Sequence, residues 1–303
     1  MSSQITARTG LAVIFAMPYA GNCEVLETQL RGVSKRLTNI THGHGYIMKF
    51  LNLVLIIALV TIAFPATAQQ DKRKRIRERS DGQRNYGVTV VEVPEDVASQ
   101  FERLKPKALL YHPIESTQHR LPLVVTLHGA GGGRRDIEQK KWRGAIAQLL
   151  KAENQQYKAM LLEPQSEGQW DPDSLEMMMD FVIRAHPEID LRRIYCIGYS
   201  MGGKGTWEWA MNYPNRFAAI IPKGFIPDLS KIDGMIDLPI WAMVGDKDSK
   251  PRVEGISAME NVLKESGSTK VRVSVFKGAN HATASGLSRY EPGVWEWLFS
   301  WNQ

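Results

Sequence analysis

The chain has 303 residues, of which 43% are hydrophobic and 23% charged, and this balance is ordinary for a soluble globular protein of one or two domains. The formal net charge is +6, but much of it comes from residues 71–84, which hold seven Lys or Arg and three acidic side chains. The remaining charge is nearly balanced, which argues against a nucleic-acid-binding surface, and two cysteines, Cys23 and Cys196, do not suggest a disulfide framework.

A second possible translation start lies at Met48. Residues 48–68 combine a short basic start, an apolar stretch from Phe50 to Phe64 and a small-x-small ending, which is the layout of a secretory signal peptide. We therefore expect export, a mature start near Gln69, a secreted or periplasmic location and no stable membrane insertion after cleavage. A retained membrane anchor is the alternative, but an apolar run of about 15 residues is short for a bilayer that needs roughly 20.

The segments on either side of this signal are expected to lie outside the folded domain. Residues 1–47 show no clear hydrophobic period or motif, so they are expected to be an extension upstream of the true start, or else a long leading part of the signal. Residues 69–85 are expected to be a solvated basic linker, with weak attachment to an anionic surface as the alternative. The folded domain is therefore expected at 86–303.

From Tyr86 onward, short apolar runs alternate with segments of helical spacing, and no internal repeat is visible. Strands are expected at residues 86–93, 108–113, 121–129, 157–164, 192–199, 217–224, 239–246 and 271–278. Helices are expected at residues 140–154, 174–187, 253–266 and 293–303, and from the end of the 192–199 strand to Tyr213. Alternation at this spacing predicts an α/β fold, with a mostly parallel central sheet, helices on both faces and no large lid.

A serine lies in the middle of a glycine cluster in the segment CIGYSMGGKG, residues 196–205. The core of this segment, GYSMG, fits the G-x-S-x-G pattern, with a predicted strand before it and a predicted helix after it. In that context the pattern predicts a sharp, strained turn that exposes the hydroxyl of Ser200, with glycines that leave room for neighbouring backbone. Ser200 is therefore the candidate nucleophile, a chance match being the alternative, while Cys196 is expected to be a small core residue.

A nucleophilic serine needs a base and an acid that orients the base, and in this architecture both follow the serine on loops after later strands. Asp246 and Asp248 follow the strand in PIWAMVGDKD, and His281 follows the next strand. His281 is the only histidine after Ser200, so it is the candidate base. Either aspartate could supply the acid.

A glycine-rich loop, LHGAGGGRRD at residues 127–136, follows an earlier strand. Its backbone from Ala130 to Gly133 can approach a substrate carbonyl, so it is expected to supply an oxyanion-hole N–H and, at Gly131, a substrate contact. A phosphate-binding loop is the alternative, but the sequence lacks the G-K-[ST] ending of a P-loop and the spacing of a dinucleotide fingerprint.

The segment EPQSEGQWDPD follows another predicted strand, is expected to form a loop at the same edge of the sheet as the glycine-rich loop, and carries Trp170. This side chain is expected either to form a wall of the substrate pocket or to pack the loop against the body of the domain. No cluster of His, Cys or carboxylate side chains has metal-ligand spacing, so neither a metal nor another cofactor is expected.

Residues 86–303 resemble the α/β-hydrolase superfamily through the segments LPLVVTLHGAGGGRRD, LEPQSEGQW, RRIYCIGYSMGGKGTWEWAMNYPNRFAAIIP, PIWAMVGDKD and GANHATASGLSRYEPGVWEWLFSW. The likeness is strongest to secreted esterases of the phospholipase/carboxylesterase, polyhydroxybutyrate-depolymerase-like and feruloyl-esterase-like kind, some of them labelled predicted peptidases. The segment SMGGKGTW, with RFAA after it, is the most specific part of this likeness.

The resemblance also implies roles for individual residues. By it, Ser200 is the nucleophile, His281 the base and Asp248 the acid. It places the oxyanion N–H groups at Ala130 and Met201. Relatives often have a Val-Pro a few residues after the acid, where this chain has DSKPR.

The sequence therefore predicts a secreted serine hydrolase that cleaves small or polymeric carboxylic esters through an acyl-enzyme. A serine peptidase of the prolyl-oligopeptidase type is the alternative on the same fold, but that type usually brings a large extra N-terminal domain. A binding protein that has lost its catalytic residues is a third possibility, and the presence of all three candidate side chains argues against it.

Overall fold

The structure is a computed structural model, and it describes residues 85–116, 119–151, 154 and 156–303. The predicted signal peptide at 48–68, the upstream segment 1–47 and the basic linker up to residue 84 lie outside the described residues. Within the described part of the chain, no helix is long and apolar enough to cross a membrane.

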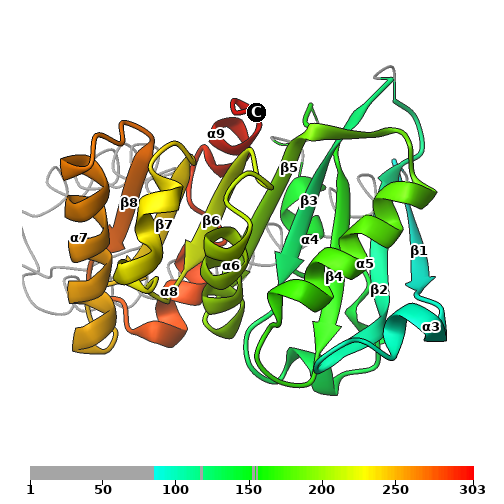
Figure 1. Cartoon of the computed structure of the whole chain (residues 1–303), viewed down its shortest axis with the longest axis horizontal. Coiled ribbons are helices and arrows are strands. Elements are labelled where there is room, and N and C mark those ends of the chain that lie inside the picture. Colours follow the sequence, from blue (N-terminus) through cyan, green and yellow to red (C-terminus); the bar gives the residue numbers. More distant parts are fainter. Residues whose placement is uncertain (1–84, 117–118, 152–153, 155) are drawn as a thin grey trace, which may run out of the picture. The chain divides into compact units, whose positions relative to one another are not determined.

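An eight-stranded sheet runs through the domain in the order β1-β2-β4-β3-β5-β6-β7-β8 (Figure 1). Its strands are β1 (Tyr86–Glu92), β2 (Leu104–Pro113), β3 (Leu121–Leu127), β4 (Met160–Ser166), β5 (Ile189–Tyr199), β6 (Ala219–Lys223), β7 (Ile240–Gly245) and β8 (Val271–Phe276). β2 pairs antiparallel with β1 and β4, and the other neighbours pair parallel. This confirms the predicted mostly parallel sheet.

Helices cover both faces of the sheet, as predicted (Figure 1). The long helices α5 (Pro172–Ala185), α6 (Met201–Asn212) and α7 (Lys250–Glu265) pack on one face, and the shorter α4 (Ile146–Leu149) and α9 (Val294–Phe299) pack on the other. Alternate side chains of a strand point to opposite faces, so each central strand contributes to two apolar cores. Burial on both faces explains the continuous apolar runs of the central strands.

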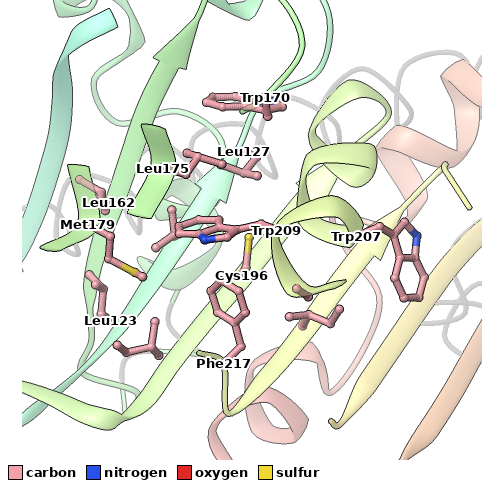
Figure 2. Packing of buried hydrophobic residues seen from close by; sticks show 14 of the residues in the cluster. Leu123, Leu127, Leu162, Trp170, Leu175, Met179, Cys196, Trp207, Trp209 and Phe217 are labelled. Atoms are coloured by element: carbon pink, nitrogen blue, oxygen red, sulfur yellow. The ribbon is translucent and has the colours of Figure 1, made fainter. Parts of the chain in front are cut away.

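The core under α5 and α6 is built around large side chains (Figure 2). Trp207 and Trp209 are fully buried, and the ring of Trp209 meets Phe217 edge to face with 4.9 Å between centroids. Cys196 is also fully buried, which confirms its predicted place in the core. Burial raises the pKa of the Cys196 thiol to about 12, so this cysteine is chemically inert at neutral pH.

The segment between β3 and β4 differs from its prediction. Its spacing predicts one helix over 140–154, but the structure has 3₁₀ turns at Gly132–Arg134 and Glu138–Lys140 and a single α-helical turn, α4. The reason is local, because Trp142 and Gly144 have φ values of 62° and 71°, and a right-handed helix cannot run through a left-handed residue.

Three further short elements were not predicted. They are α3 (Glu95–Ala98), a 3₁₀ segment at Leu229–Met235 and α8 (His281–Leu287). Each has seven residues or fewer, which is too short to show a helical hydrophobic period in the sequence.

Candidate active site

Ser200 lies at the turn between β5 and α6, with φ of 58° and ψ of −116°. A non-glycine residue in such a region carries about 1–3 kcal/mol of backbone strain, so the surrounding structure must hold it in place. The backbone N–H of Ser200 donates to the carbonyl of Lys223 over 2.8 Å, and the carbonyl of Ser200 accepts from the N–H of Lys204 over 2.9 Å. The strained turn predicted from the glycine pattern is therefore present.

The glycines around Ser200 are required by close backbone contacts. A Cβ on Gly198 would lie 2.0 Å from the carbonyl oxygen of Gly202, and a Cβ on Gly202 would lie 2.0 Å from the carbonyl oxygen of Leu127. Leu127 ends β3 and begins the glycine-rich loop. The glycines thus let the serine turn sit directly against that loop, where a side chain would push the two apart.

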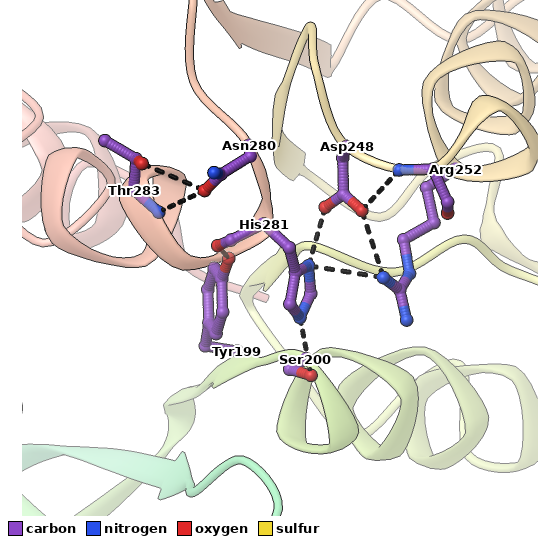
Figure 3. Close-up of polar contacts among 8 residues, drawn as sticks. Tyr199, Ser200, Asp248, Arg252, Asn280, His281 and Thr283 are labelled. Carbon is purple, nitrogen blue, oxygen red and sulfur yellow. Dashed lines mark hydrogen bonds and ion pairs between the residues drawn. The ribbon is translucent and has the colours of Figure 1, made fainter.

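His281 connects Ser200 to Asp248 (Figure 3). Its Nε2 lies 2.9 Å from Oγ of Ser200, and its Nδ1 lies 2.6 Å from Oδ2 of Asp248. His281 is the first residue of α8, whose N-cap is Asn280, and its carbonyl accepts a hydrogen bond from the hydroxyl of Tyr199. The arrangement allows the imidazole to accept the serine proton and the carboxylate to hold the opposite side of the ring.

Asp248 is almost fully buried, with 1% of its side chain exposed. Burial by itself raises the pKa of this carboxyl, but hydrogen bonds from His281, from the backbone N–H of Ser249 and from Arg252 outweigh burial and leave the pKa below its ordinary value. Asp246, the other sequence candidate, accepts a hydrogen bond from the N–H of Gly278 over 2.7 Å. The structure therefore places Asp248, and not Asp246, next to His281.

Arg252 is a neighbour of this group that sequence reasoning missed. Its Nη1 lies 3.0 Å from Oδ1 of Asp248 and 3.3 Å from Nδ1 of His281 (Figure 3). Its guanidinium lies over the ring of Phe225. Arg252 lies four residues after Asp248 within DSKPR, the stretch that departs from the relatives' pattern. On a helix this spacing brings two side chains together, so it could have indicated the contact. The predicted helix begins at residue 253, whereas α7 begins at Lys250 and includes this arginine.

The candidate oxyanion residues lie on the glycine-rich loop and at the start of α6. Ala130 and Gly131 line the same cleft as Ser200 and His281, and Gly131 has a left-handed φ of 81° that turns the loop back. Met201 is the first residue of α6, so its N–H is one of the donors that a helix leaves without an internal partner. The side chain of Met201 packs against the apolar core.

Trp170 does not form a wall of the cleft. Only 2% of it is exposed, its Nε1–H donates to the carbonyl of His128 over 3.1 Å, and its ring packs on the imidazole of His128 with 4.6 Å between centroids. The imidazole in turn donates from Nδ1 to the carbonyl of Gly129 and accepts at Nε2 from the N–H of Ser166. Burial lowers the pKa of His128 to about 4, so this ring is neutral. Trp170 and His128 together anchor the glycine-rich loop.

A cleft of about 840 Å³ opens over Ser200 and His281. Basic side chains are prominent in its lining, namely Arg135, Lys140, Arg143, Lys223 and Arg289. Burial, together with the nearby charge of Arg289, lowers the pKa of Lys223 to about 8. Among the described residues, no three His, Cys, Asp or Glu side chains are grouped closely enough to hold a metal ion.

The sequence model of the Dienelactone hydrolase family matches residues 108–292. No curated protein matches the chain. Among solved structures, the chain is similar to a thermostable esterase, with 27% identity and a TM-score of 0.61 over 72% of this chain. The chain spans 64% of the length of that esterase.

Two structures with lower identity share the fold. An esterase of Pyrococcus furiosus is 15% identical, with a TM-score of 0.52 over 71% of this chain and 92% of that one. An acylaminoacyl peptidase of Pyrococcus horikoshii is 16% identical, with a TM-score of 0.52 over 68% of this chain and 39% of that one. Together with the family match, these likenesses confirm the α/β-hydrolase fold that the sequence predicts.

Proposed function

Because the chain belongs to the dienelactone hydrolase family, we propose that it is a serine hydrolase that cleaves carboxylic esters, small or polymeric. One observation carries the proposal: Oγ of Ser200, the imidazole of His281 and the carboxylate of Asp248 form a continuous chain of contacts at 2.9 Å and 2.6 Å. The hydroxyl of Ser200, at one end of this series of contacts, lies on a strained turn and lines an open cleft.

In the first half of the proposed reaction, Ser200 forms an acyl-enzyme. Nε2 of His281 takes the proton from Oγ of Ser200 as Oγ attacks the ester carbonyl, and Asp248 stabilises the imidazolium. The N–H groups of Ala130 and Met201 stabilise the oxyanion, helped by the positive end of the α6 dipole. The imidazolium then gives its proton to the leaving alcohol, and the bond between the carbonyl carbon and the alcohol oxygen breaks.

In the second half, water releases the acid. His281 takes a proton from a water molecule, and the resulting hydroxide attacks the acyl carbon bound to Oγ of Ser200. Collapse of this second tetrahedral intermediate breaks the bond to Oγ, which regains its proton from His281. The enzyme returns to its starting state without a cofactor.

A substrate panel tests the class of bond. It contains p-nitrophenyl esters of increasing acyl length, a feruloyl ester and a peptide amide. We expect hydrolysis of esters, with a burst of p-nitrophenol equal to the enzyme concentration if release of the acyl group is the slower step. Cleavage of the peptide amide with a higher kcat/KM than every ester would contradict the proposal and favour a peptidase.

Arg252 should affect the pH profile through Asp248. Its hydrogen bond to Oδ1 helps to hold the pKa of the Asp248 carboxyl below its ordinary value. Arg252→Gln should raise that pKa, so the fall in kcat/KM that accompanies protonation of Asp248 should move to a higher pH. Because Asp248 also loses a charged hydrogen-bond donor, kcat/KM at neutral pH should fall roughly tenfold. The pH profile of kcat/KM measures both effects. Lys250→Gln, at an exposed residue of the same helical turn, is the matched control, and a shift to lower pH in the Arg252 variant would refute this role.

The N-terminal sequence motivates a proposal about processing. The apolar stretch from Phe50 to Phe64 and the Ala66-Thr67-Ala68 ending support cleavage before Gln69 and export of the mature chain. Expression of the full chain in a bacterial host, followed by N-terminal sequencing of the exported protein, should give QQDKRKR. Recovery of residues 1–47 on the exported protein would disprove this processing.

A further inference from the structure

Glu163 is a buried acid that the proposed reaction does not use. It lies in β4, a strand that is buried along its whole length, and only 7% of the residue is exposed. It is also the one acid among the described residues that line the cleft. A carboxyl group in such a place is costly unless its oxygens are satisfied, so its partners are informative.

The carboxyl of Glu163 is only partly satisfied. It accepts hydrogen bonds from the hydroxyl of Thr126 and from the backbone N–H of Ile146. Its Oε1 is buried and has no hydrogen-bond partner in the described part of the chain. A Cβ at Gly144 would lie 3.4 Å from this Oε1, so Gly144 is the neighbour of the oxygen among the residues that line the cleft.

The sheet register fixes where this oxygen lies relative to Ser200. β4 neighbours β3, which neighbours β5. Val125 pairs with Leu162, the residue before Glu163, and Thr126 pairs with Ile197. Glu163 is therefore two strand spacings, on the order of 10 Å, to the side of the strand that leads into Ser200. Thr126, Glu163 and Ile197 all line the cleft, so one elongated ligand can contact both Ser200 and Glu163.

The chemistry of the ligand follows from the charges around Oε1. An unpartnered carboxyl oxygen requires a hydrogen-bond donor. The charge of Lys140 acts directly on Glu163, and Arg135 and Arg143 also line the cleft, so these positive charges oppose the binding of an ammonium group. A neutral donor carries no such penalty, and a hydroxyl group is the simplest neutral donor that an ester substrate can carry.

We propose that Glu163 is a specificity-determining residue whose Oε1 accepts a hydrogen bond from a hydroxyl group at the far end of the ester substrate. The inference rests on the proposed esterase function and adds a substrate class to it, namely esters that carry a hydroxyl remote from the scissile bond. Burial raises the pKa of Glu163 to about 7, and the positive charge of Lys140 acts in the opposite direction. The ionised carboxylate is the stronger acceptor, so the preference for the hydroxyl should grow as pH rises through about 7.

Two matched substrate series test the proposal. Ethyl esters of ω-hydroxyalkanoic acids of increasing length are compared with ethyl esters of the corresponding alkanoic acids, and acetate monoesters of α,ω-diols are compared with alkyl acetates. For each pair, the ratio of kcat/KM with and without the hydroxyl is measured from acidic to alkaline pH. Both members of a pair depend equally on the groups that carry out the reaction, so the pH dependence of the reaction itself cancels in the ratio.

In the wild-type protein, one chain length in at least one series should show a hydroxyl preference of roughly tenfold, as expected for a hydrogen bond to a charged group. Glu163→Met should remove the preference. The double variant Glu163→Met, Lys140→Met keeps the test if loss of the acid near half-buried Lys140 prevents folding of the single variant. Glu138→Gln is the matched control, because it changes an exposed carboxylate two residues before Lys140, and it should keep the preference.

A hydroxyl preference that survives Glu163→Met, or its absence at every length in both series, would overturn the proposal. A preference that does not rise with pH in the wild-type protein would also overturn it, and this measurement needs no variant. Hydrolysis of the hydroxyl-free esters and labelling of Ser200 by a fluorophosphonate are read separately. If those two fail, the esterase function itself is wrong, so the two failures are distinguishable.

Discussion

Ser200→Ala should abolish ester hydrolysis and fluorophosphonate labelling while the protein stays folded. The substitution removes the Oγ that His281 activates, and in a unit of this kind loss of the nucleophile costs on the order of 10⁶ in kcat. The turn should survive, because the backbone bonds that Ser200 makes with Lys223 and Lys204 do not involve its hydroxyl. Thermal unfolding of the variant, measured beside its hydrolysis of p-nitrophenyl esters, separates lost chemistry from lost structure.

A second serine in the same cleft supplies the control. Ser285 lines the cleft from α8, so Ser285→Ala removes a neighbouring hydroxyl without touching the proposed reaction. This variant should keep both the labelling and the burst. If Ser200→Ala retained wild-type hydrolysis instead, the nucleophile would lie elsewhere, and the glycines around Ser200 would only form a tight turn.

The turn at Ser200 was predictable because its signal is local. A strand, a G-x-S-x-G pattern and a helix follow one another within a short stretch, and the same stretch determines the strained geometry. The order of the parallel strands then puts the loops after β7 and β8 at the edge where β5 ends, which brings Asp248 and His281 within reach. Local patterns and sheet topology together were enough to propose Ser200, His281 and an aspartate of the loop after β7.

The choice between the two aspartates needed the structure. Asp246 and Asp248 lie two residues apart on one loop, and the sequence alone does not show which carboxylate the turn directs toward His281. In the folded chain, the N–H of Gly278 binds Asp246, and the side chain of Arg252 binds Asp248. Both partners are supplied by the tertiary structure around the loop.

The sequence also does not show in which direction the side chains of Trp170 and Glu163 point. From its loop position, Trp170 could either form a pocket wall or pack the loop against the domain. In the structure it contacts His128 and is a packing residue. Glu163 occurs inside an apolar strand, where the period of the run gives no reason for a carboxyl. Its relation to the cleft becomes visible only when β4 is placed beside β3 and Gly144 above the carboxyl.

Asp248→Asn should lower kcat by about 10⁴ without unfolding the protein, by analogy with other serine, histidine and aspartate sites. An amide is close in shape to the carboxylate, so packing around the buried side chain is preserved. Its NH₂ group, however, can donate to Nδ1 of His281, which moves the ring proton to Nε2, the atom that must accept the proton of Ser200. The loss should appear equally in kcat and kcat/KM, because an interaction made in the transition state is removed.

Asp246→Asn is the matched comparison, since it makes the same chemical change two residues away. Its amide oxygen can still accept from the N–H of Gly278, so activity should fall far less than in the Asp248 variant. Steady-state kinetics of both variants, with thermal unfolding to verify folding, gives the ranking. The reverse order would make Asp246 the acid, and it would require the loop after β7 to rearrange so that Asp248 releases both His281 and Arg252 in the working enzyme.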